Sequence, residues 1–133
     1  MAYPTGQIWV QLILAQLAID EGNPKGAEAL LAEALALMAN SDLQWLCGIK
    51  LARTVANWAA ETGQPDEALL LQAACDRLLH QMGMVDNEPK WPERFQRAHK
   101  ALGDAVADRM RAAGRALDYT SLLQRARRAL HHT

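Results

Sequence analysis

The sequence has few of the residues that favour β-strands. Aromatic residues make up 5% of its 133 positions, and valine, isoleucine and threonine are also scarce. Half of the residues are hydrophobic, and much of that half is alanine and leucine, which are strong helix formers. The composition therefore predicts an all-α protein, and the length predicts a single domain over residues 1–133.

The sequence also lacks a run of about 18 apolar residues, so we expect no membrane-spanning segment. Residues 8–19 are largely apolar, but glutamines interrupt them and no basic flank precedes them, so we expect a buried helix there and not a signal peptide. The two cysteines, Cys47 and Cys75, form neither a redox pair nor a disulfide framework. Together these features favour a cytoplasmic protein whose cysteines are small buried side chains.

Motifs that carry catalysis are missing as well. There is no GxxxxGK[ST] phosphate loop and no HExxH, CxxC or GxSxG sequence. His80 and His99 fall within expected helices, and the terminal His131–His132 pair is not expected to bind metal. We therefore expect no enzyme activity, no cofactor and no metal site.

The net charge of −1 excludes a strong global attraction to nucleic acid or membrane. Residues 1–66 hold seven acidic and three basic side chains, whereas residues 67–133 hold eight acidic and eleven basic ones. This asymmetry either orients the chain against a partner or reflects ordinary solvated helix faces. The basic C-terminal stretch has no recognition-helix pattern, so we expect no direct nucleic-acid binding.

Apolar residues at helical spacing, separated by Gly, Pro, Asn and Asp, predict seven helices. Their expected ranges are about 8–21, 25–39, 42–62, 66–82, 92–102, 105–113 and 118–131. Pro4, Thr5 and Gly6 are expected to precede the first helix, with Thr5 as its N-cap. Its buried face should contain Ile8, Leu12, Ala15 and Ile19, widened by Trp9, Ile13 and Leu17.

The later boundaries rest on single cap residues. Ser41 or Asp42 is expected to cap the third helix, Asp104 the sixth and Asp118 the seventh. Gly114 is expected to end the sixth helix.

One turn occurs twice. Gly22-Asn23-Pro24 and Gly63-Gln64-Pro65 lie 41 residues apart, each between two expected helices. Similar small and large apolar residues surround both turns, namely Leu14, Ala15, Ala18, Ala27, Leu31 and Ala34 around the first, and Val55, Ala56, Ala59 and Ala68 around the second. The sequence therefore predicts two helix pairs, at residues 8–40 and 42–82, followed by non-repeating helices over residues 92–131.

These residues resemble the signature positions of tetratricopeptide repeats. The period of 41 residues is similar to the long variant in MalT-like, LuxR-type bacterial transcriptional regulators, and residues 73–79, 102–104 and 114–117 look like the C-terminal end of their repeat region. The resemblance implies antiparallel helix pairs stacked as a short right-handed superhelix with C-terminal capping helices. One departure is that Ala107 and Arg111 stand where the family tends to place aromatic residues.

Such regulators carry a nucleotide-binding module upstream and a DNA-binding module downstream, and this sequence ends at Thr133, about where the latter would begin. The resemblance thus implies the sensor or scaffold portion of a bacterial signalling or transcription regulator. We expect a non-catalytic protein–protein interaction module that binds a peptide, a partner protein or flanking domains of a larger regulator. Two alternatives are a small-molecule effector-sensing domain and a homodimerisation module.

In stacked helix pairs of this family, the first helix of each pair lines a concave groove. The resemblance therefore implies a partner-binding groove made by Trp9, Leu12, Gln16, Asp20, Lys50, Arg53 and Asn57. The last three fall at i, i+3 and i+7 on one helical stripe, and two cations beside an amide suit a carboxylate. Alternatively, Lys50 and Arg53 only pair with acids on neighbouring helices.

Trp91 lies between two prolines in the longest irregular stretch of the sequence. It either holds this loop onto the helices or contacts a partner.

Overall fold

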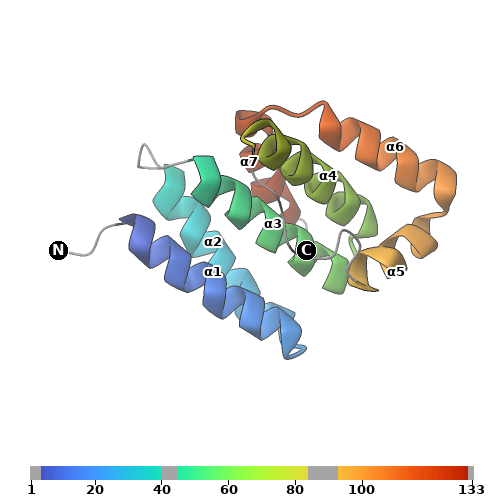
Figure 1. The fold of residues 1–133 in the computed structure, drawn as a ribbon. Coiled ribbons are helices and arrows are strands. Elements are labelled where there is room, and N and C mark those ends of the chain that lie inside the picture. The colour runs from blue at the N-terminus through green and yellow to red at the C-terminus, as the bar shows by residue number, and fades with distance from the viewer. Residues whose placement is uncertain (1–3, 40–44, 84–92, 132–133) are drawn as a thin grey trace.

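The structure is a computed structural model that describes residues 4–39, 45–83 and 93–131. Within these ranges it contains α-helices and no strand, which confirms the all-α prediction (Figure 1). The helices are α1 Pro4–Asp20, α2 Pro24–Ala39, α3 Trp45–Glu61, α4 Pro65–Gln81, α5 Glu93–Leu102, α6 Asp104–Arg115 and α7 Tyr119–Leu130. The expected caps at Ser41 or Asp42 lie outside the described residues.

The two Gly-x-Pro turns have the same conformation. Their glycines take positive φ, 81° at Gly22 and 77° at Gly63, which favours glycine because it has no Cβ. In each turn the next amide donates to an alanine carbonyl five residues earlier, Asn23 to Ala18 at 2.8 Å and Gln64 to Ala59 at 3.0 Å. The repeated turn therefore joins α1 to α2 and α3 to α4 in the same way.

Helix α1 differs from its prediction at two places. It begins at Pro4, because a proline is well tolerated in the first helical turn, so Pro4–Gly6 do not form a non-helical lead. Its buried face contains Ile8, Leu12, Ala15 and Ile19 as predicted, but Ile13 and Leu17 are 66% and 52% exposed. The expected widening of the buried face is wrong for these two residues, because no described element packs over that side of α1.

Helix α3 is the centre of the molecule and packs against α1, α2, α4, α5 and α7. Trp58 on this helix is 1% exposed, and its indole Nε1 donates to the Pro24 carbonyl at 3.0 Å. This bond fixes α3 against the turn of the first pair. Other fully buried side chains of the second pair include Ile49, Leu51, Val55, Leu69 and Leu71.

Gly114 does not end α6, contrary to the prediction, since the helix continues to Arg115. Gly114 is buried, and a Cβ at this position would collide with the Leu70 carbonyl oxygen of α4. The glycine therefore serves close helix–helix packing and not helix termination. Asp104 is likewise the first residue of α6 and not its N-cap, a position that Gly103 takes at φ 85°.

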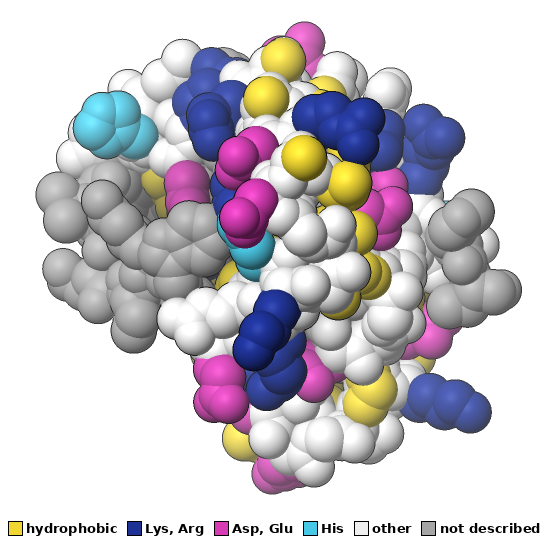
Figure 2. Space-filling view, turned by 90° about the vertical axis from the view of Figure 1, so that its right-hand side faces the viewer, with side chains coloured by type: hydrophobic (Ala, Val, Ile, Leu, Met, Phe, Trp, Pro, Cys, Tyr) yellow, Lys and Arg dark blue, Asp and Glu magenta, His cyan; other side chains and the backbone are white. Residues whose placement is uncertain are grey.

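Helix α6 packs far more extensively against α4 than against α5, so the last helices do not repeat the tight pairing of α1 with α2. The face that α5 and α6 present to solvent carries acidic and basic side chains interspersed with small apolar ones (Figure 2). Its exposed charged residues are Glu93, Arg97, Lys100, Asp104, Asp108, Arg109 and Arg115.

Helix α7 starts at the predicted cap, because an Asp118 carboxylate oxygen accepts from the Ser121 amide at 2.7 Å. It then returns to the middle of the molecule and packs against α2, α3 and α4 (Figure 1). Arg125 donates to both carboxylate oxygens of Glu67 at 2.9–3.2 Å, which ties α7 to the start of α4. Helix α7 thus contacts both helix pairs.

Candidate functional site

A groove of about 390 Å³ runs along one side of α1 and α3 and reaches the start of α5. All seven residues of the predicted groove line it, namely Trp9, Leu12, Gln16, Asp20, Lys50, Arg53 and Asn57. Among the described residues, Ile13, Thr54 and Arg94 line it as well. The structure thus brings the predicted residues together along one surface.

The repeat spacing explains why these residues meet. Helices α1 and α3 end at Asp20 and Glu61, which are 41 residues apart, so residues at this spacing occupy the same face of each helix. Trp9 and Lys50, Leu12 and Arg53, and Gln16 and Asn57 are three such pairs. One pair is joined directly, because the Asn57 amide donates to Gln16 Oε1 at 2.7 Å.

Hydrogen bonds cross the floor of the groove in a continuous chain. Gln16 accepts from Asn57 and donates through Nε2 to Asp20 Oδ1 at 2.9 Å. Arg94 of α5 donates to the same Asp20 oxygen at 2.7 Å. Three helices are therefore linked across the groove, which holds its polar side chains in a defined arrangement.

The lining of the groove is rich in positive charge. Among the described residues that line it there are three cations, Lys50, Arg53 and Arg94, and one carboxylate, that of Asp20. Arg94 bridges the two acids at the equivalent ends of α1 and α3, lying 2.7 Å from Asp20 and 3.8 Å from Glu61. Within the described residues, no carboxylate forms an ion pair with Lys50.

Apolar side chains line another part of the groove. Leu12 is 5% exposed, Trp9 is half-buried, and Ile13 is largely exposed to solvent. A ligand in this groove would thus meet indole and aliphatic carbon from α1 and cationic groups from α3 and α5. This combination suits a peptide that carries both a carboxylate and an apolar side chain.

Sequence reasoning missed Arg94, Ile13 and Thr54. Arg94 follows Arg53 by 41 residues, as Arg53 follows Leu12, and Ile13 and Thr54 are a further pair at this spacing. Extending the repeat period one step beyond the second pair would therefore have identified Arg94. The hypotheses on Trp91 concern a residue outside those described.

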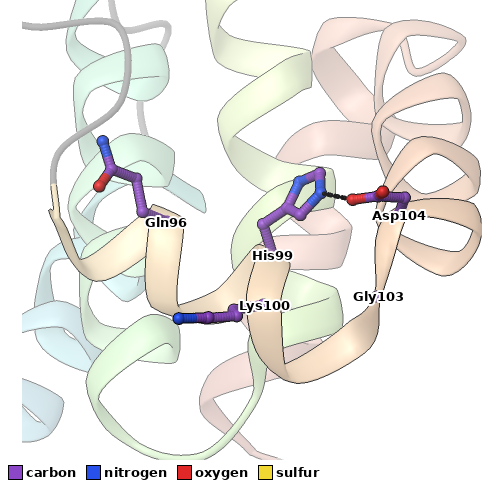
Figure 3. Close-up of a pocket in the computed structure, with 5 residues that line it drawn as sticks. All are labelled: Gln96, His99, Lys100, Gly103 and Asp104. Atoms are coloured by element: carbon purple, nitrogen blue, oxygen red, sulfur yellow. Dashed lines mark hydrogen bonds and ion pairs between the residues drawn. The ribbon is translucent and has the colours of Figure 1, made fainter.

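A second hollow, of about 460 Å³, lies at the corner between α5 and α6 (Figure 3). Here the His99 and Asp104 side chains point toward each other, with His99 Nε2 2.6 Å from Asp104 Oδ1. Arg111 Nη1 lies 2.8 Å from His99 Nδ1. Because a guanidinium only donates, Nδ1 accepts from Arg111, and Nε2 carries the proton that it donates to Asp104.

Helix α6 also contains Ala107, one turn before Arg111. Both are buried, Ala107 completely and Arg111 at 8% exposure. Burial lowers the pKa of Arg111, with Asp108 opposing that shift and Arg115 adding to it. His99 is therefore engaged on both ring nitrogens in joining α5 to α6, and it offers no nitrogen to a ligand in this arrangement.

The cysteines lie apart from both hollows. Cys47 and Cys75 are free thiols buried in the core, and burial raises the pKa of both. In the part of the chain that the structure describes, no three metal-ligating side chains cluster. No helix there is both long and apolar enough to cross a membrane.

No protein-family model matches this chain, and neither a curated protein nor a solved structure matches it. The groove must therefore be interpreted from its own chemistry.

Proposed function

We propose that this chain is a non-catalytic interaction module that binds the carboxylate-bearing end of a peptide or partner protein in the α1–α3–α5 groove. The observation that carries the proposal is the composition of that groove. Three cations and two amides from different helices converge there beside an apolar wall, and the carboxylates near them, Asp20 and Glu61, both lie against Arg94. Such a surface favours an anionic ligand over a neutral or cationic one.

In this proposal the ligand carboxylate lies between Lys50 and Arg53 and accepts hydrogen bonds from both cations. Such charge-assisted bonds are stronger than bonds between neutral groups. Arg94 is already bound to Asp20, so it holds the end of the groove and contributes positive potential. The Asn57 side chain has a carbonyl and a second amide hydrogen with which to bind the peptide backbone. An apolar ligand side chain would pack on Trp9 and Leu12.

The wider setting is part of the same proposal. The repeated turn and the 41-residue spacing support a tetratricopeptide-like stacking of helix pairs. They also support a role as the sensor or scaffold portion of a bacterial signalling or transcription regulator in the cytoplasm. In that role the module would hold a partner, while other domains generate or read the signal.

The test is a binding experiment with two matched peptide pools. One pool has free C-terminal carboxylates and an apolar penultimate residue, and the other is identical but C-terminally amidated. Isothermal titration should show binding of the acid pool and at least about tenfold weaker binding of the amidated pool, since one charge-assisted bond contributes about 1.5–3 kcal/mol. Lys50→Glu and Arg53→Glu should each weaken the acid pool similarly.

Lys25→Glu is the matched control, because Lys25 is exposed on α2 and does not line the groove. It makes the same change in net charge and should leave affinity unchanged. Equal binding of the two pools, or equal losses in Lys25→Glu and Lys50→Glu, would contradict the groove assignment. Far-ultraviolet circular dichroism of each variant separates loss of binding from loss of fold.

A further inference from the structure

Helix α1 presents an apolar stripe to solvent. Among the described residues there are five exposed large hydrophobic side chains, and four of them lie on this helix, Val10 at 56%, Ile13 at 66%, Leu14 at 46% and Leu17 at 52%. Their spacing of i, i+3, i+4 and i+7 places them on one face. We call these four residues the α1 stripe. Clustered exposed apolar side chains of this kind mark interaction surfaces more often than single ones do.

The equivalent positions in the second helix pair, on α3, are covered by other helices. The residues 41 positions after Val10, Leu14 and Leu17 are Leu51, Val55 and Trp58, and all three are buried. They share one face of α3, and Trp58 on that face bonds to Pro24 at the start of α2. Helix α3 also packs against α1, α2 and α7, so this face is covered by neighbouring helices. The α1 stripe occupies the equivalent positions, and no described helix packs over it.

The distribution of charged residues indicates that the α1 stripe packs against a second copy of itself. Residues 4–19 of α1 contain no acidic or basic side chain, so two α1 stripes can meet across a two-fold axis without opposing like charges. Head-to-tail stacking would instead place the stripe against the other end of the molecule. That end, formed by α5 and α6, is covered by charges of both signs (Figure 2), and burying them against an apolar helix would leave them unpaired.

We propose that the α1 stripe is a homodimer interface in which α1 packs against α1 of a second copy about a two-fold axis. A 17-residue helix is about 25 Å long and about 10 Å wide, so this contact is small beside the roughly 800 Å² per partner of a standard interface. The dimer is therefore weak and dissociates on dilution. Assembly stops at two copies, because a two-fold contact uses both stripes.

The test is sedimentation velocity of the full chain over a wide concentration series. The wild-type chain should pass from monomer to dimer with no larger species. Leu14→Glu/Leu17→Glu places four carboxylates in the contact, and it should raise the dimer dissociation constant at least about tenfold. Met82→Glu is the matched control, since Met82 is exposed by 42% at the end of α4, outside the stripe.

A wild-type chain that stays monomeric at the highest concentration would overturn the proposal. A dimer that Leu14→Glu/Leu17→Glu leaves intact, or that Met82→Glu disrupts equally, would also overturn it. An open series of larger species would show head-to-tail assembly and reject the two-fold contact. Both replaced leucines are about half exposed, so the variant should keep its helical circular dichroism, and Leu17→Lys provides a second substitution of opposite charge.

Discussion

The two helix pairs have the same turn and the same spacing but different surroundings. The second pair is enclosed, because α3 and α4 pack against α1, α2, α5, α6 and α7. The first pair is covered mainly by α3, and no described element packs behind α1. Leu17 and Trp58 illustrate the difference, since these equivalent positions are 52% and 1% exposed. The location of a pair in the molecule, and not its local pattern, thus decides how much of its apolar surface is buried.

The largest expected effect comes from truncating these two equivalent residues. Trp58→Ala should lower the free energy of unfolding by about 3–5 kcal/mol, because it opens a large cavity and removes the bond to Pro24. Leu17→Ala should change it by no more than about 0.5 kcal/mol in the monomer. Urea unfolding followed by circular dichroism at low protein concentration measures both values.

Similar losses in the two variants would show that the back of α1 is covered in solution. In that case the contrast between the pairs would fail. Repeating the Leu17→Ala measurement at high concentration would add the contribution of the dimer contact.

A second effect concerns how α6 closes the second pair. Gly114→Ala should destabilise the protein by about 1–3 kcal/mol or more, because the new Cβ would collide with the Leu70 carbonyl oxygen. Gly6→Ala is the control, since Gly6 is helical and nothing lies within 4 Å of a Cβ built there. It should be neutral or stabilise by up to about 1 kcal/mol, because alanine favours the helix.

Thermal melts of both variants measure this difference. A Gly114→Ala protein as stable as the wild type would mean that α6 does not approach α4 closely. The α4–α6 contact would then no longer distinguish the second pair from the first.

Local signals in the sequence predicted the helices and the repeated turn. A glycine before Pro24 or Pro65 specifies a left-handed residue and a helix start within a few positions, so nearby residues were sufficient. The groove residues were predicted from the resemblance to tetratricopeptide repeats, and they meet because residues at equal spacing on equivalent helices share a face. The same period of 41 residues leads from Arg53 to Arg94, so it also predicts Arg94 as a groove residue once it is extended past the second pair.

Features that depend on distant contacts were not predictable in this way. Ile13 and Leu17 are large apolar residues of a largely apolar helix, and they are exposed because no described helix packs over them. Gly114 resembles a helix terminator in sequence, yet its role is set by Leu70 in another helix. The packing of α7 against α4 likewise depends on pairs such as Arg125 and Glu67, which lie 58 residues apart.

A smaller effect is expected where α7 is attached to the second pair. Arg125→Ala should lower the free energy of unfolding by about 1 kcal/mol, since the bidentate bond to Glu67 is partly shielded from water. Arg128→Ala on the same helix is the control, because Arg128 is exposed, and it should stay within about 0.5 kcal/mol of the wild type. Urea titrations provide both values, and equal losses would argue against the α7–α4 attachment.

The smallest effect should appear at the start of α7, as a dependence of stability on pH. Hydrogen bonds from Ser121, the backbone amide first, lower the pKa of Asp118 below its usual 3.8, with Arg77 adding to the shift. A lowered pKa means that the charged cap stabilises the fold above the usual value and loses this effect as pH falls through the lowered one. The melting temperature should therefore contain a small Asp118 contribution that disappears at acidic pH.

Asp118→Asn retains an oxygen that accepts from Ser121 but has no charge to titrate, so it should remove that pH-dependent part and keep most of the cap. Asp118→Ala should lower the melting temperature at neutral pH as well, because it removes the acceptor. In Asp118→Ala, amide hydrogen exchange should become faster in α7 and at Gly48, which lies next to Tyr119. Exchange in α1 should stay unchanged, because α7 packs on the second pair and not on the back of α1. An equal rise in α1 would show that the two pairs open as one unit.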